Sequence, residues 1–145
     1  MRTRVHLLGG LEVQWDGERL EAALPGRQGR LLFAYLTLHR ARPVRRDELI
    51  DALWSDEGSA GGDGLLRPPL SRLRRALGDG RLEGRAELRL RFPDDTWIDW
   101  EFAREELRVG SAAYAAGDHA TGYERASRPG SRPRSATARP ARARS

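Results

Sequence analysis

The chain has 145 residues, of which 39% are hydrophobic and 32% charged, a balance typical of a soluble globular protein with one domain or one and a half. It contains no cysteine, which excludes a disulfide framework and a thiolate metal site. All 26 basic residues are arginine. GC-rich coding produces that bias, so the arginine content alone is not evidence of phosphate binding.

The net charge of +5 is unevenly distributed. Residues 67–91 carry eight arginines and three acids, whereas residues 92–126 carry three arginines and eight acids. Residues 127–145 carry six arginines and no acid. The high isoelectric point therefore comes from two basic segments, of which only the first has the pattern of regular structure.

Neither a membrane span nor a signal peptide is expected. The longest nearly apolar run, residues 31–38, is much shorter than the roughly 18 residues that a membrane span needs. The N-terminal segment is interrupted by His6 and Glu12, so it does not have the apolar core of a signal peptide. We therefore expect a cytoplasmic protein with no membrane partner.

The first half of the chain predicts a small sheet followed by two helices. Short strands are expected within residues 3–21, with Asp16-Gly17 as a strong hairpin signal. Apolar residues at helical spacing predict a helix over 27–39, with Leu31, Leu32, Tyr35, Leu36 and Leu38 in its stripe. A second helix is predicted over 46–54, with Arg45 in place of the Ser, Thr, Asp or Asn that usually caps a helix.

A third helix and a β-hairpin follow the glycine-rich loop at 55–64. Leu66, Leu70, Leu73 and Leu77 fall within about 60° of helical arc. Pro68 and Pro69 are tolerated only in a first turn, so the helix is predicted to start at one of them and to span about 68–77. The strand at 87–92 alternates apolar and mostly basic residues, and residues 81–84 supply its partner.

The last part of the chain changes character twice. Residues 97–126 predict two helices divided at Gly117-Asp118, in the manner of a tetratricopeptide hairpin. Residues 127–145 contain no Leu, Ile, Val, Phe, Tyr or Trp and are expected to be disordered. We interpret this tail as the product of a frameshift or truncation, and the alternative is a basic arm that adds non-specific phosphate affinity.

No catalytic or metal-binding constellation is present in the sequence. His6, His39 and His119 lie in different predicted elements at no metal-ligand spacing. The glycine-rich loop lacks the following Lys and Ser or Thr of a phosphate-binding loop. We therefore expect neither an enzyme nor a protein with a metal or cofactor.

Three helices followed by a β-hairpin is the order of a winged helix-turn-helix, whose last helix reads the major groove of DNA. Arginine suits that position, because its planar fork pairs with guanine or with phosphate. The alternative is an ordinary solvated face, enriched in arginine by coding bias. The residues predicted to contact DNA are Arg67, Ser71, Arg72, Arg74, Arg75, Arg85, Arg89 and Arg91, with Arg89 and Arg91 pointing outward from the wing.

Four segments in combined order, "LLGGLEV", "GRQGRLLFAYL", "RPVRRDELIDALW" and "SRLRRALG", resemble the N-terminal domain of the SARP-type transcription factors, the actinobacterial antibiotic regulatory proteins. The resemblance implies an α+β fold, with an OmpR-type winged helix over residues 1–96. It also implies a partial bacterial transcriptional activator domain over 97–126, with the disordered tail over 127–145.

The implied function is sequence-specific regulation of transcription through double-stranded DNA. The resemblance also points to RNA polymerase as a partner of the loop at 55–64, and it leaves open a homodimer on DNA. Two departures from the family weaken the DNA interpretation, namely the prolines at the helix start and Glu87, which would repel phosphate. The alternative function is a winged helix that acts as a protein-interaction adaptor without binding DNA, or a truncated regulator without function.

Overall fold

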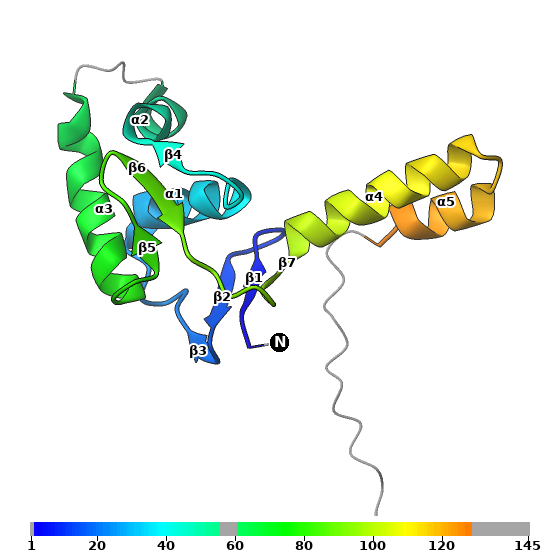
Figure 1. The fold of residues 1–145 in the computed structure, drawn as a ribbon, viewed down its shortest axis with the longest axis horizontal. Coiled ribbons are helices and arrows are strands. Elements are labelled where there is room, and N and C mark those ends of the chain that lie inside the picture. The colour runs from blue at the N-terminus through cyan, green and yellow to red at the C-terminus, as the bar shows by residue number, and fades with distance from the viewer. Residues whose placement is uncertain (1, 56–60, 129–145) are drawn as a thin grey trace, which may run out of the picture. The chain divides into compact units, whose positions relative to one another are not determined.

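The computed structural model describes residues 2–55 and 61–128, which divide between Glu101 and Phe102 into two compact units (Figure 1). All but two residues of the predicted disordered tail lie outside the described residues. Half of the loop that was predicted to face RNA polymerase, residues 56–60, lies outside them as well. The domain boundary between residues 96 and 97 stays a prediction.

The first unit opens with a four-stranded sheet in the order β3-β2-β1-β7. Its strands are β1 (Arg4–His6), β2 (Glu12–Trp15), β3 (Glu18–Arg19) and β7 (Trp97–Ile98). The predicted hairpin at Asp16-Gly17 is confirmed, because both residues have the positive φ, 51° and 86°, of the tight turns that match the twist of paired strands.

Strand β7 corrects the prediction that residues 97–126 are helical from the start. Trp97 and Ile98 pair in parallel with Arg4 and Val5 of β1, and this pairing buries Ile98. The helix that follows begins at Asp99. Residues 97–98 form a strand because they pair with β1, which lies at the other end of the unit in sequence. The periodicity of the local sequence contains no information on that pairing.

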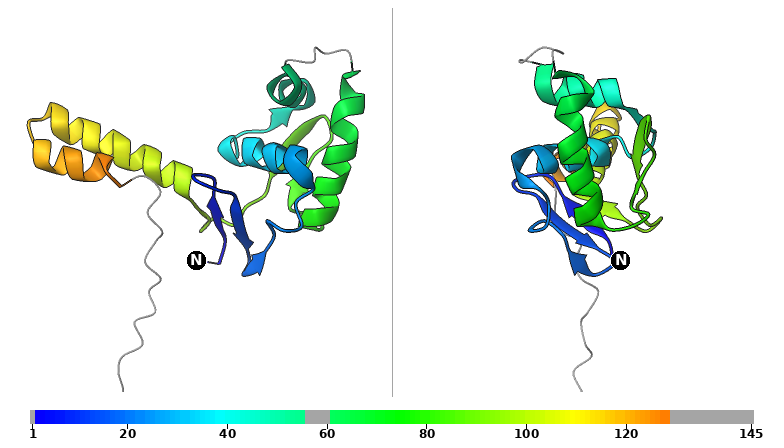
Figure 2. Two further views of the ribbon diagram at one scale, coloured as in Figure 1. Left: turned by 180° about the vertical axis from the view of Figure 1, so that it is seen from behind. Right: turned by 90° about the vertical axis from the view of Figure 1, so that its left-hand side faces the viewer.

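Three helices and a second small sheet complete the unit. The helices are α1 (Gly26–Leu38), α2 (Arg46–Trp54) and α3 (Asp63–Leu77), and α3 contacts both of the others (Figure 2). The second sheet has the order β4-β6-β5, formed by β4 (Val44–Arg45), β5 (Leu82–Glu83) and β6 (Glu87–Leu90). Strands β5 and β6 are the predicted wing hairpin, in antiparallel register.

The core is formed by apolar side chains from every layer of this unit. All four leucines predicted on the inner face of α3 are buried, as are Phe33 of α1 and Trp15 of β2. The predicted stripe of α1 was partly wrong, because Leu31 and Leu38 are exposed. Arg45 stands at the start of α2 without a side-chain capping bond, as predicted.

Helix α3 begins earlier than the sequence predicted. It starts at Asp63, so that Pro68 and Pro69 lie inside the helix and not in its first turn. Asp63 and Gly64, which were assigned to the loop at 55–64, are therefore helical. Proline fits the first turn best, but here Leu66 and Leu70 are both buried, and their packing holds the helix through the prolines.

The carboxylate of Asp99, the first residue of helix α4 (Asp99–Ala115), is buried in the first unit. It accepts hydrogen bonds from the backbone N–H groups of Leu7 and Leu8 at 2.9–3.0 Å. Glu101 forms a second link, because its carboxylate accepts two hydrogen bonds of 2.7 Å from Arg40. The first turn of α4 thereby belongs to the winged-helix unit.

The second unit contains the rest of α4 and helix α5 (His119–Ala126), which confirms the two helices predicted on either side of Gly117-Asp118. Asp118 caps α5 by accepting a hydrogen bond of 3.1 Å from the backbone N–H of Thr121. The helices approach closely at two glycines, because a Cβ atom on Gly122 would lie 2.9 Å from the carbonyl oxygen of Gly110.

We expect Gly122→Ala to destabilise the packing of α4 on α5 by about 1–3 kcal/mol, because the added methyl group has no room between the helices. Hydrogen exchange of the α5 amides measures the change. Gly64→Ala is the matched control, since the same methyl group there meets open space, and it is expected to stabilise α3 by about 0.5–1 kcal/mol. Equal protection of α5 in Gly122→Ala and the unchanged protein would contradict the close approach.

Candidate nucleic-acid interface

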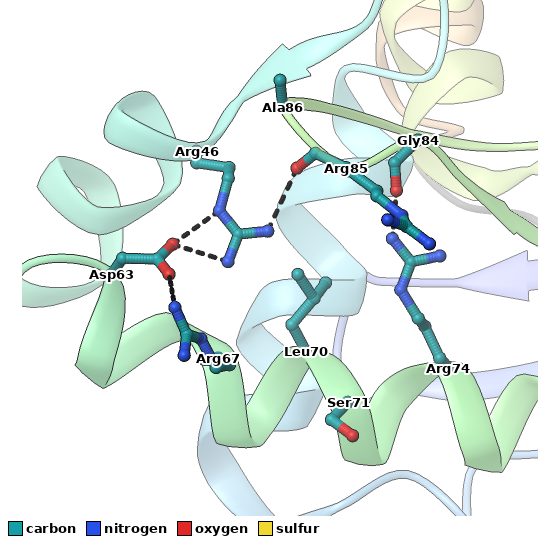
Figure 3. Close-up of a pocket in the computed structure, with 9 residues that line it drawn as sticks. All are labelled: Arg46, Asp63, Arg67, Leu70, Ser71, Arg74, Gly84, Arg85 and Ala86. Atoms are coloured by element: carbon teal, nitrogen blue, oxygen red, sulfur yellow. Dashed lines mark hydrogen bonds and ion pairs between the residues drawn. The ribbon is translucent and has the colours of Figure 1, made fainter.

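An open groove of about 1010 Å³ lies between α3 and the turn of the wing (Figure 3). It joins α3 to the start of α2 and to the residues between β5 and β6. Its lining is Arg46, Asp63, Arg67, Leu70, Ser71, Arg74, Gly84, Arg85 and Ala86. Four of the predicted DNA-contacting residues, Arg67, Ser71, Arg74 and Arg85, are thereby brought together.

The outer face of α3 carries most of the arginines that the sequence placed there. Ser71, Arg72 and Arg75 are exposed, and Leu73 beside them is fully buried. Arg67 is also exposed, and it donates a hydrogen bond of 3.0 Å to Asp63 one turn earlier. The division of α3 into a leucine side and an arginine side is therefore present in the structure.

Arg74 differs from this pattern, because it is partly buried and turned toward the wing (Figure 3). Its guanidinium group donates a hydrogen bond of 2.9 Å to the carbonyl oxygen of Leu82 and another to that of Gly84. Burial, followed by the charges of Arg46 and Arg85, lowers the pKa of Arg74. Arg74, which the sequence analysis named among the DNA-contacting residues, therefore joins α3 to the wing.

The three arginines of the wing have different surroundings. Arg85 is exposed at the turn, whereas Arg91 is exposed but forms an ion pair of 2.8 Å with Glu83. Arg89 alternates with the buried Leu88 and Leu90, as the strand pattern predicted, but it is partly buried and donates a hydrogen bond of 3.1 Å to the carbonyl oxygen of Arg40. Glu87 is exposed at the start of β6.

Two charged residues of the groove, Arg46 and Asp63, were not among the residues predicted from the sequence. Arg46 donates a hydrogen bond of 2.6 Å from Nε to one oxygen of Asp63, and its Nη2 lies 2.6 Å from the same oxygen in an ion pair. Its Nη1 donates to the carbonyl oxygen of Arg85 at 3.0 Å. The hydrogen bonds from Arg46 and then Arg67 lower the pKa of Asp63. The adjacent pairing of Arg45 with Glu87 places Arg46 beside the wing, and that contact between distant segments has no local sequence signal.

Replacing Arg74 by alanine is expected to lower the free energy of unfolding by about 1–3 kcal/mol, because two charge-assisted hydrogen bonds to the wing are lost. Arg75→Ala is the matched control one position along, and it should change stability by no more than about 0.5 kcal/mol because that side chain is exposed. Urea unfolding curves of the two variants measure the difference. If both variants unfold at the same urea concentration, Arg74 does not hold the wing.

Within residues 2–55 and 61–128 no group of side chains has the composition of a metal site. None of the helices in that part of the chain is both long enough and apolar enough to cross a membrane.

A sheet at the N-terminus, three helices and a wing hairpin define a winged-helix protein of the OmpR type. A solved structure of EmbR from Mycobacterium tuberculosis, in complex with a low-affinity phosphopeptide, is similar to this chain with a TM-score of 0.63 and 29% identity. The similarity covers 89% of this chain and 36% of the EmbR chain.

The relatives by sequence are regulatory proteins and not enzymes. The chain is 34% identical over 129 residues to the transcriptional regulatory protein EmbR of Mycobacterium tuberculosis and Mycobacterium bovis, which covers 84% of this chain. It is 39% identical over 79 residues to the regulatory protein AfsR of Streptomyces coelicolor, which covers 54% of this chain and 8% of AfsR. No family model matches the sequence.

The chain belongs to the SARP-type family of transcriptional regulators, of which EmbR and AfsR are members, and the resemblance found in the sequence is thereby confirmed. It spans 31% of the length of the EmbR relatives that it matches.

Proposed function

We propose that this chain binds double-stranded DNA in a sequence-specific manner and regulates transcription. The observation that carries the proposal is the exposed face of α3, where Ser71, Arg72 and Arg75 project from a helix whose other face is anchored in the core. A helix of this kind fits the major groove, in which arginine donates bidentate hydrogen bonds to guanine.

The environment of each side chain supports a division of roles. Ser71, Arg72 and Arg75 are assigned to base edges, because they are exposed on α3. Arg67, Arg85 and Arg91 are assigned to phosphates, which position the protein without reading sequence; they lie at the ends of this surface and on the wing.

Arg74 and Arg89 are assigned to holding the wing, since each donates hydrogen bonds to backbone carbonyl groups of another segment. This assignment removes two of the eight predicted arginine and serine contacts from the DNA surface. The remaining six still present five guanidinium groups, enough for a binding site that depends strongly on salt.

Selection of bound duplexes from a random pool, performed with the full chain, tests the proposal. We expect enrichment of one sequence family, and an affinity for it that falls steeply as the salt concentration rises. Arg75→Ala should weaken binding with the fold intact, as judged by circular dichroism. Absence of enrichment together with affinity that is independent of salt would reject DNA binding and favour the protein-interaction adaptor.

A further inference from the structure

Asp63 is the acidic residue in a groove that is otherwise lined by arginines and uncharged residues (Figure 3). One of its carboxylate oxygens accepts from Arg46 at 2.6 Å, and the other accepts from Arg67 at 3.0 Å. The carboxylate therefore bridges an arginine of α2 and an arginine of α3.

The ion pairs of Asp63 occupy N–H groups of Arg46 and Arg67 that could otherwise donate to a DNA phosphate. A guanidinium group pairs with carboxylate and with phosphate through the same planar fork, so the two anions compete for it. Arg46 has all three nitrogen atoms engaged inside the protein, two on Asp63 and one on the carbonyl oxygen of Arg85. Arg67 has one nitrogen engaged on Asp63, and its side chain is 77% exposed.

The bridge lies at the surface, where DNA would be. The side chain of Asp63 is 42% exposed, and the same groove contains Ser71 of the proposed reading face and Arg85 of the wing. A phosphate that approached this groove would meet a negative charge between two arginines. Four arginines and one acid line the groove, so the acid removes about a quarter of its positive charge.

We propose that Asp63 competes with the DNA backbone for Arg46 and Arg67, so that a phosphate contact of either arginine forms at the expense of its ion pair with Asp63 and binding to duplexes of every sequence is weaker. The inference rests on the proposed DNA binding, and it adds the residue that sets the non-specific affinity. Phosphate contacts carry no sequence information, so a residue that withholds them lowers the affinity for random DNA without changing which sequence is preferred.

The test uses the full chain and a random-sequence duplex, with affinity measured by fluorescence anisotropy from 50 to 200 mM salt. Asp63→Asn is expected to bind more tightly and to steepen the slope of log affinity against log salt by about 0.9 for each additional phosphate that the protein neutralises. One additional phosphate makes the loss of affinity across this fourfold salt range about 3.5 times larger than in the unchanged protein. Asp63→Ser, a second neutral variant with a side chain suited to a helix start, should behave in the same way.

Three variants separate competition from a general change of charge or stability. Asp63→Glu keeps the negative charge and should keep the original slope. Asp51→Asn removes one exposed acid from α2 outside the groove, and it should change the slope by much less than Asp63→Asn. In Asp63→Asn combined with Arg67→Ala, the increase in slope should shrink. Thermal melting of each variant shows that it is folded.

The outcomes separate this inference from the proposed function. If the unchanged protein binds duplex and Arg75→Ala weakens that binding, an unaltered slope in Asp63→Asn and Asp63→Ser overturns the competitor role alone. An equal increase in Asp51→Asn overturns it as well. If neither the unchanged protein nor the Asp63 variants bind duplex at 50 mM salt, both the competitor role and DNA binding are rejected. Binding by Asp63→Asn where the unchanged protein does not bind supports the competitor role directly.

Discussion

Leu73→Ala is expected to lower the free energy of unfolding by about 2–5 kcal/mol. Leu73 is fully buried in the middle of α3, where it belongs to the cluster that contains Leu66, Leu70 and Leu77. Removing most of its side chain loses apolar burial and leaves a cavity that the surrounding layers cannot close completely. Urea unfolding followed by tryptophan fluorescence measures the change.

The neighbouring Arg72→Ala is the control for Leu73→Ala, because its exposed side chain contributes little to stability. Leu73→Ala should therefore lower the stability of the fold, whereas Arg72→Ala should lower the affinity for DNA and leave the stability nearly unchanged. A loss of stability below about 1 kcal/mol in Leu73→Ala would show that the leucine side of α3 is not packed as described.

Pro68→Ala is expected to stabilise the protein, by up to about 3 kcal/mol, because an interior proline lacks the N–H group of the helix ladder and its ring crowds the preceding turn. Pro68 is exposed, so its replacement removes little packing. Pro69→Ala should produce a smaller increase in stability, since Pro69 is buried and its ring contributes to the core. Thermal melting of the two single variants measures both effects.

An unchanged melting temperature in Pro68→Ala would indicate that α3 begins at the prolines, as the sequence alone predicted. The double replacement provides a further check. If the two effects are independent they should add, whereas neighbouring residues in one helical turn often couple by more than about 0.5 kcal/mol.

Features encoded by local repetition were predictable from the sequence. The leucines of α3 recur with the helical period and all four are buried. The turn at Asp16-Gly17 has the residues that a tight hairpin requires, and the alternation in β6 identified the strand of the wing. In each case the residues that determine the structure lie within a few positions of one another in the sequence, so the local pattern predicts the structure correctly.

Features decided by distant segments were not predictable in the same way. Arg74 follows Leu73 on the helix, at the border between the inner and outer faces, and only the carbonyl groups of Leu82 and Gly84 decide which way it turns. Arg46 and Asp63 meet across the loop between α2 and α3, a contact that no local period describes. The start of α3 was misplaced for a related reason, because the propensity of proline for a first turn was outweighed by the packing of the leucines around it.

The pairing of β7 with β1 has a consequence for the order in which this unit can fold during translation. The backbone amide of Leu7 and its acceptor Asp99 are 92 positions apart, and the parallel pairing of Val5 with Ile98 spans nearly the same stretch. Within this unit the hairpin of β1 and β2 is synthesised before the helices, but the strand that covers its open edge is synthesised after all three helices and the wing. An open strand edge is a template for wrong pairing, and long-range pairing is slow to form. The hairpin therefore remains exposed through most of the synthesis of its own domain, and its edge closes only when Ile98 and Asp99 arrive.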